Sequence, residues 1–260
     1  MDFFDYIIVG GGTAGCVLAN RLSENKSNSV LLIEAGGRKY NPWLYIPGGY
    51  FKTIFSKKLN WRYETQPEKE LNFRKIVWPR GKVLGGSGAI NGMVYIRGQK
   101  EDFDHWKDLG NSEWSFEKVL PFFIKSEKQK SKNDELNKKY HNTNGLFYIS
   151  DYPNKFILSE TFIEAANEQN IKTNYDFNGA FQSGAGYYQI TTNNWLRSDS
   201  DICFLKPALK RSNLTVLTNT LVTKIIIKNK KVIGVKVSKN GNTKTLKCGK
   251  EVILSAGTVN

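Results

Sequence analysis

Two short apolar runs with a helical pattern between them open the chain. Residues 6–9 and 30–33 are almost wholly apolar, which is typical of buried parallel strands. Residues 13–25 repeat apolar side chains, Ala14 and Leu18 among them, at the spacing of one helix face. Such a helix covers one face of a sheet, so the pattern predicts a strand, helix, strand unit of the α/β class.

Short β-type runs follow one another near the end of the chain. Asn-Lys and Asn-Gly turns separate the runs, which lie at 214–218, 222–227, 232–237, 243–246 and 251–255. We expect the middle three to form an antiparallel meander. The last run is fully apolar over Val252-Ile253-Leu254, so we expect it to return to the parallel sheet beside the first two strands.

The middle of the chain is less regular. Residues 36–49 hold four glycines and two prolines, and aromatic and basic residues continue to Trp61. Compact domains carry an excursion of this length when it has a function. Polar residues at 128–144 predict an exposed loop. We also expect a strand over 187–192 and helices over 102–110, 115–130 (with Ser115 as N-cap) and 158–170.

The charge of the chain invites a nucleic-acid hypothesis, because the net charge is +14. However, the lysines of residues 118–139 alternate with acids such as Glu117 and Glu127, which is typical of a solvated helix face and loop. We therefore expect no nucleic-acid partner. Attraction to an anionic membrane surface is an alternative that composition leaves open.

The length of the chain and its cysteines narrow the class of protein further. A chain of 260 residues can form one large domain or two modest ones. Cys16, Cys203 and Cys248 lack metal or redox spacing, so we expect reduced core thiols and no metal site. The acidic start of the chain does not resemble a signal peptide, and no apolar run is long enough to span a membrane. These features favour a cytoplasmic protein.

Glycines after the first apolar run have the spacing of a dinucleotide fingerprint. Gly10 permits a tight turn, Gly12 lets main-chain amides approach a pyrophosphate, and Gly15 lets the helix pack against the strand. The start of the helix then faces negative charge. Glu34 closes the second apolar run, about twenty residues on, where a carboxylate accepts hydrogen bonds from the adenosine ribose. The same fingerprint leaves a nicotinamide-dependent dehydrogenase as an alternative.

A second glycine segment spans residues 78–98, with six glycines among twenty-one positions. A backbone this permissive can approach a flat ring closely. Ser87, Asn91 and main-chain amides could donate hydrogen bonds near N1, O2 and N5 of a flavin, where reduction builds up negative charge. From composition alone, a glycine-rich surface loop is an equally good interpretation.

Residues 80–93, RGKVLGGSGAINGM, resemble the first signature of the glucose-methanol-choline (GMC) flavoprotein oxidoreductases. Further stretches resemble the same family in the same order. They are 13–19 (TAGCVLA), 32–36 (LIEAG), 114–123 (WSFEKVLPFF), 205–216 (LKPALKRSNLTV) and 252–257 (VILSAG), which resembles the opening of the second signature. The chain is thus similar to the N-terminal portion of choline and alcohol dehydrogenases.

This resemblance implies an α/β fold in which a Rossmann-like FAD-binding domain combines a parallel sheet with a β-meander. It implies an FAD-binding domain at 1–37 and 205–260, an excursion covering the flavin at 38–150, and the start of a substrate domain at 151–204. The implied FAD-binding residues are Gly10, Gly12, Thr13, Ala14 and Gly15 for the pyrophosphate, Glu34 and Ala35 for the ribose, Val83, Gly86, Ser87, Asn91, Gly92, Met93 and Val94 along the flavin, Val222 at the adenine, and Ala256 and Gly257 over the dinucleotide.

Three positions depart from the family pattern. Gly88 replaces a usual serine or threonine, which removes one hydroxyl near the flavin. Ile90 stands where some members carry a histidine linked to the flavin, so we expect non-covalent FAD. Asp199 replaces a frequent serine, which puts the turn after Arg197 in doubt.

The resemblance implies oxidation of a small-molecule alcohol, with hydride transfer to flavin N5 and a histidine as base. His105 lies in a helical pattern and His141 in a polar loop, so neither is the expected base. The family's base would follow Asn260, so we expect no catalytic residue and no turnover from this chain alone. An alternative is a flavin-binding module completed by a separate polypeptide that carries the C-terminal half.

Overall fold

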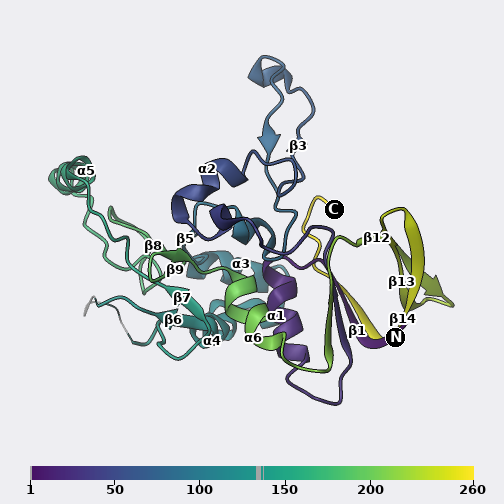
Figure 1. Ribbon diagram of the computed structural model, residues 1–260. Coiled ribbons are helices and arrows are strands. Elements are labelled where there is room, and N and C mark those ends of the chain that lie inside the picture. Colours follow the sequence, from purple (N-terminus) through teal and green to yellow (C-terminus); the bar gives the residue numbers. More distant parts are fainter. Residues whose placement is uncertain (1, 133–135, 137) are drawn as a thin grey trace. The chain divides into compact units, whose positions relative to one another are not determined.

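The computed structural model describes residues 2–132, 136 and 138–260, which form two compact units (Figure 1). The first unit comprises Met1–Gly92 and Trp195–Asn260, and the second comprises Met93–Asn194. Each unit is described by itself. No helix among the described residues is long and apolar enough to cross a membrane.

The central sheet of the first unit contains, among the residues described, strands in the order β11-β2-β1-β14-β13-β12. Their bounds are β1 (Phe3–Val9), β2 (Val30–Ile33), β11 (Leu214–Leu217), β12 (Leu221–Lys228), β13 (Lys231–Lys239) and β14 (Asn242–Leu254). The pairs β11/β2, β2/β1 and β1/β14 are parallel, whereas β12, β13 and β14 form an antiparallel meander. The predicted α/β class, parallel sheet and meander are confirmed.

A single strand, β14, belongs to both the antiparallel meander and the parallel part of this sheet. The expectation of two separate strands at 243–246 and 251–255 was therefore wrong. β14 is continuous over 13 residues. Its first half pairs with β13 up to Lys247, and its second half pairs with β1 from Lys247 onward. A Cβ at Gly249 would lie 2.7 Å from the Phe3 ring, so the glycine leaves room for that side chain.

Both faces of the parallel sheet are buried, which explains why its strands are apolar at successive positions. Ile8 and Leu32 pack with Cys16 and Ala19 of helix α1 (Thr13–Leu22). Ile7, Leu31 and Ile33 pack with the meander residues Val235, Val237 and Leu246. Alternate side chains of one strand therefore fill two separate cores.

The remaining elements of the first unit are short. Helix α6 (Lys206–Ala208) follows a π-helical turn at Asp201–Leu205. Further short elements of this unit are α2 (Tyr50–Thr53), β3 (Tyr63–Glu64), β4 (Val77–Trp78) and β10 (Leu196–Arg197). The excursion after residue 36 is not loose, because Leu44 is buried in one apolar cluster with Val83, Ala89 and Ile90.

The second unit contains α3 (Lys100–Asp108), α4 (Phe116–Ser126), α5 (Ile157–Glu168), β5 (Val94–Tyr95), β6 (Glu127–Gln129), β7 (Phe147–Ile149), β8 (Gln189–Ile190) and β9 (Thr192–Asn193). Ser115 caps α4 as predicted, since its hydroxyl accepts a hydrogen bond from the Lys118 amide. The predicted strand over 187–192 is instead the two short strands β8 and β9.

The helix predicted over 115–130 is also too long. It ends at Ser126, and the chain continues as β6, which pairs with β7 in parallel. Glu127 and Gln129 are buried, so the loop predicted over 128–144 is not exposed at its start, and the acidic residue at 127 is not part of a solvated face. Residues 133–135 and 137 of that loop lie outside the described residues.

Candidate functional site

The first glycine loop (residues 10–15) leaves the carboxyl end of β1, where strands of a parallel sheet commonly receive ligands. Gly10 has φ +102°, a conformation that favours glycine. A Cβ at Gly10 would lie 2.5 Å from the Ser255 carbonyl oxygen. A Cβ at Gly15 would lie 1.9 Å from the Gly10 carbonyl oxygen. The turn and the approach of helix to strand therefore both require glycine.

The amino terminus of α1 opens onto this loop. The Cys16 amide donates to the Gly12 carbonyl at 3.0 Å, so the amides before it have no intrahelical partner. The first turn of α1 carries no acidic residue. A Cβ at Gly12 would meet only the Gly86 Cα, at 3.8 Å, so this backbone is accessible. These groups, which include Thr13 and Ala14, fit an anion such as a pyrophosphate.

Glu34 is fixed at the carboxyl end of β2 and only 6% exposed. Its Oε2 accepts a hydrogen bond from the Gly11 amide and its Oε1 one from the Gly36 amide, both at 2.8 Å. Burial raises the pKa of this carboxyl, although the two amides oppose that effect. The carboxylate oxygens retain lone pairs for a further donor, and Ala35 follows directly.

The second glycine loop (residues 81–88) meets the first through main-chain contacts. The Gly85 amide donates to the Gly11 carbonyl at 2.8 Å, and a Cβ at Gly86 would lie 2.7 Å from the Gly12 Cα. Gly85 and Gly86 both have positive φ, +90° and +57°. Ser87 accepts a hydrogen bond from the Gly81 amide at 3.1 Å. The structure thus brings together two loops that sequence analysis linked only through the family resemblance.

Arg197 secures the segment after this loop and was missed in the sequence analysis. Its Nη1 donates to the Gly88 carbonyl at 3.0 Å and to Asn91 Oδ1 at 2.8 Å, and its Nη2 donates to the Asn91 carbonyl at 2.7 Å. The residue is 2% exposed. A single arginine has no spacing or periodicity that could have identified it as a support for a loop one hundred residues earlier in the sequence.

The remaining residues predicted to bind FAD lie outside the two glycine loops. Ser255 follows β14, and its Oγ lies 3.0 Å from the Val9 carbonyl oxygen and 2.8 Å from the Gly10 carbonyl oxygen. Ala256 and Gly257 come directly after Ser255 in the sequence and therefore begin beside the first glycine loop. Val222 is partly buried on β12, opposite Val237. Gly92 is exposed, while Met93 and Val94 begin the second unit, Met93 buried and Val94 half-exposed.

The two histidines are poor candidates for a catalytic base. His105 is exposed in the last turn of α3. The His141 side chain is 5% exposed, with Nδ1 2.9 Å from Glu127 Oε1 and Nε2 2.9 Å from Asp176 Oδ2. Burial lowers the pKa of His141, but the two carboxylates outweigh this effect and raise it to about 9. The imidazole is therefore protonated at neutral pH and donates both ring protons.

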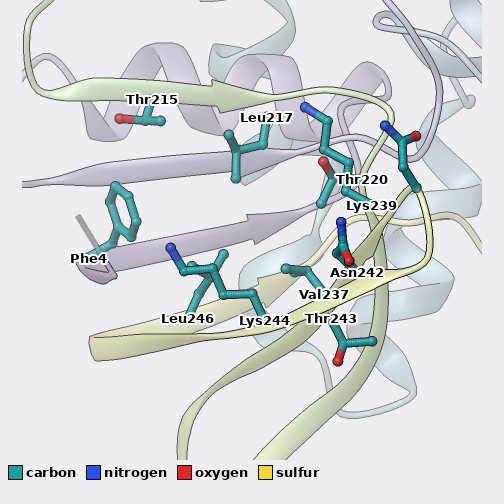
Figure 2. A pocket seen from close by; sticks show the side chains of 11 residues that line it. Phe4, Thr215, Leu217, Thr220, Val237, Lys239, Asn242, Thr243, Lys244 and Leu246 are labelled. Carbon is teal, nitrogen blue, oxygen red and sulfur yellow. The ribbon is translucent and has the colours of Figure 1, made fainter.

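A cavity of about 680 Å³ lies elsewhere, between β11, the start of β1 and the meander (Figure 2). Its floor is apolar, with Phe4, Leu217 and Leu246, and its rim includes Lys239 and Lys244. No glycine-loop residue lines it. Within the described part of the chain, no group of His, Cys, Asp and Glu side chains could hold a metal ion.

The fold places the chain in the class of Rossmann-like α/β proteins. The sequence matches the GMC oxidoreductase family over residues 4–260, so the chain belongs to the GMC oxidoreductase family and corresponds to its N-terminal region. The family resemblance and the fold class drawn from the sequence are both confirmed.

Two relatives with similar sequences are longer than this chain. An alcohol dehydrogenase [acceptor] from Pseudomonas putida is 45% identical over 260 residues, covering 99% of this chain and 46% of the relative. An oxygen-dependent choline dehydrogenase from Sinorhizobium fredii is 39% identical over 256 residues, covering 98% and 46%. The chain therefore spans about half the length of the curated relatives it matches.

Solved structures of the same fold include flavoenzymes. Pyridoxine 4-oxidase from Mesorbium loti has a TM-score of 0.92 and 28% identity, covering 98% of this chain and 49% of the other. An FAD-dependent oxidoreductase from Chaetomium thermophilum has a TM-score of 0.90 and 31% identity, covering 98% and 45%.

Proposed function

We propose that the first unit binds FAD and that the chain is the FAD-binding part of an oxidoreductase acting on the CH–OH group of small-molecule alcohols. The observation that supports this proposal best is the main-chain junction between the two glycine loops at the amino terminus of α1. A nicotinamide-dependent enzyme would need the first loop alone, so the junction favours a flavin dinucleotide over the nicotinamide alternative.

In this proposal the first glycine loop holds the pyrophosphate, with Gly10, Gly12, Thr13, Ala14 and Gly15 around it. Glu34 and Ala35 bind the adenosine ribose, and Val222 contributes its backbone at the adenine. Val83, Gly86, Ser87, Asn91, Gly92, Met93 and Val94 follow the flavin and its ribityl chain, and Ala256 and Gly257 lie over the dinucleotide. The FAD-binding domain would comprise 1–37 and 205–260, and the substrate domain would begin within 151–204.

We propose non-covalent binding because of the residue at position 90. Ile90 is buried in an apolar cluster and has no nucleophilic group that could form a bond to a flavin. Bound FAD would accept the hydride of the alcohol. The residues of this chain would bind and orient the dinucleotide, and we assign none of them as the base.

Spectroscopy tests FAD binding directly. The purified chain, titrated with FAD, should show a 1:1 complex with a perturbed flavin absorption band, and acid precipitation should leave the flavin in the supernatant. Gly12→Asp should weaken binding by about a hundredfold, because it adds a negative charge at the start of α1 where space is available. Gly48→Asp, at a position with no atom within 4 Å of a Cβ, is the matched control.

NAD binding without FAD binding would contradict the proposal and support the nicotinamide alternative. Flavin that stays with the precipitated protein would contradict non-covalent attachment alone.

The chain spans about half of its relatives, and both ring nitrogens of His141 are engaged by carboxylates, which supports a second candidate function. The chain would then be a flavin-binding module whose activity depends on a separate polypeptide. Adding choline or a primary alcohol to the FAD complex should leave the flavin oxidised. Rapid bleaching of the flavin band by the alcohol would show that the chain is active by itself.

A further inference from the structure

A buried ion pair lies beneath the second glycine loop. Lys39 Nζ is 2.6 Å from Asp199 Oδ2, and both side chains are 2% exposed. The Lys39 ammonium also lies 4.9 Å from the centre of the Tyr45 ring. Asp201 Oδ2 lies 4.0 Å from the same ammonium. Removing Lys39 therefore leaves two carboxylates without their shared cation, and removing Asp199 leaves Lys39 with only the longer of its two ion pairs.

Asp199 is held from a second side. Its Oδ1 accepts hydrogen bonds from the amides of Asp201 and Ile202, at 3.1 and 3.2 Å, so it caps the helical turn that begins there. The turn after Arg197, which the sequence analysis placed in doubt, is therefore ordered around this carboxylate. Its two oxygens connect the excursion at Lys39 with the helical segment that precedes α6.

The carboxylate also borders the glycine junction. A Cβ at Gly85 would lie 3.1 Å from Asp199 Oδ2, so the carboxylate occupies the space beside Gly85 that a side chain would need. Gly85 is the residue whose amide donates to Gly11. Two residues before Asp199, Arg197 holds Gly88 and Asn91. The segment 197–199 thus lies against the second glycine loop at Gly85 and Gly88.

We propose that Lys39 and Asp199 are positioning residues for the flavin site: their ion pair fixes Gly85 and Gly86 against Gly11 and Gly12 and thereby sets the affinity for FAD. This inference rests on the proposed function, since it assumes that FAD binds at the joined loops. The pair acts through the backbone of the loop. It adds a determinant of cofactor affinity that lies outside both glycine motifs.

Three variants of the full chain test the pair. Asp199→Asn and Lys39→Met each remove one charge, and Lys39→Met/Asp199→Asn removes both. Each single variant should raise the Kd for FAD by about tenfold or more, because it unbalances the buried charges of Lys39, Asp199 and Asp201 and the water that enters displaces the loop. The double variant should bind FAD no more weakly than Lys39→Met, since it leaves one carboxylate, Asp201, without a nearby cation where Lys39→Met leaves two.

Amide hydrogen exchange provides a readout that needs no cofactor. The Gly85 amide should exchange faster in both single variants than in the unmodified chain, and the perturbation of the bound-flavin spectrum should diminish in parallel. Val235→Ala is the control for a general loss of stability, because Val235 is fully buried in the core on the meander side of the sheet. It should leave the Kd for FAD within about twofold.

The outcomes separate the two claims. If the unmodified chain fails to bind FAD, the proposed function is wrong. If the unmodified chain binds FAD and Asp199→Asn binds it within twofold with unchanged exchange at Gly85, the positioning role is wrong. A Kd that follows the melting temperature equally in Val235→Ala and Asp199→Asn would also overturn the role. If Asp199→Asn does not fold, Lys39→Met takes its place in the same comparisons.

Discussion

A single methyl group at position 15 would collide with the backbone of β1. The Cβ of alanine would lie 1.9 Å from the Gly10 carbonyl oxygen and 2.9 Å from Ser255 Oγ, and both neighbours are held by hydrogen bonds. Gly15→Ala should therefore move α1 away from the sheet. We expect a loss of about 2 kcal/mol in the free energy of unfolding, measured by urea denaturation.

Gly48→Ala is the control for this prediction, because no atom lies within 4 Å of its Cβ. It should leave stability within about 1 kcal/mol of the original or raise it slightly, since alanine restricts the unfolded chain. Equal losses in the two variants would show that the packing of α1 on β1 is looser than the structure indicates.

Because His141 is protonated in the folded chain, we expect the free energy of unfolding to fall at alkaline pH. The pKa of His141 is raised from 6.5 to about 9 in the folded chain, so its imidazolium stabilises the fold fully below about pH 6.5. That contribution decreases as the pH rises through about 9. The charges facing the ring are Glu127 and Asp176, and Arg97 faces Glu127 from the other side. We expect on the order of 2 kcal/mol to be lost across this range.

Thermal unfolding between pH 6 and pH 9.5 measures this effect. His141→Gln should be less stable at pH 6 and should lose most of the slope with pH. His105→Gln should keep the slope, because His105 is exposed. A melting temperature of the unmodified chain that stays constant to pH 9.5 would contradict the assigned protonation of His141.

Residues with local signals could be predicted from the sequence, and residues with distant partners could not. Gly10 and Glu34 were identified because their spacing to neighbouring apolar runs follows directly from the geometry of a strand and a turn. Lys39, Arg197 and His141 act through partners that are 160, 106 and 35 positions away, respectively. Nothing in the local composition distinguishes them from ordinary surface charges.

At the scale of elements, the meander depends on a close approach between β13 and β14. Gly234 pairs with Lys247, and a Cβ at Gly234 would lie 2.1 Å from the Leu246 carbonyl oxygen. Gly234→Ala should separate the two strands and lower the free energy of unfolding by about 2 kcal/mol. Lys236→Ala, at an exposed position of the same strand, is the control and should change stability little.

Circular dichroism during urea denaturation would measure both variants. If Gly234→Ala were as stable as Lys236→Ala, the strands could shift without loss of pairing.

The existence of the main elements could be predicted better than their ends. Periodicity found α1, α4 and α5, because amphipathic spacing persists over several turns. The helix before β6 was predicted too long, because Glu127 and Gln129 have polar side chains that suit a helix surface. Their burial depends on Arg97, His141 and Gln189, which only the tertiary structure brings near.

At the scale of the molecule, the proposed cofactor contacts are distributed unevenly between the units. The glycine loops, Glu34, Arg197 and the ion pair under the second loop all belong to the first unit. Met93 and Val94, the last two residues proposed along the flavin, belong by sequence to the second unit. The family match covers both units, and the chain spans about half the length of the curated relatives it matches.

The position of β14 between β1 and β13 also constrains how the molecule forms during synthesis. β1 begins at Phe3, yet the partner on one of its edges is not made until residues 247–254 emerge. At about 5–20 residues per second, translation leaves that edge uncovered for roughly ten to fifty seconds. One edge of this apolar strand therefore stays unpaired until residues 247–254 emerge, and folding yield should depend on chaperones that shield nascent chains.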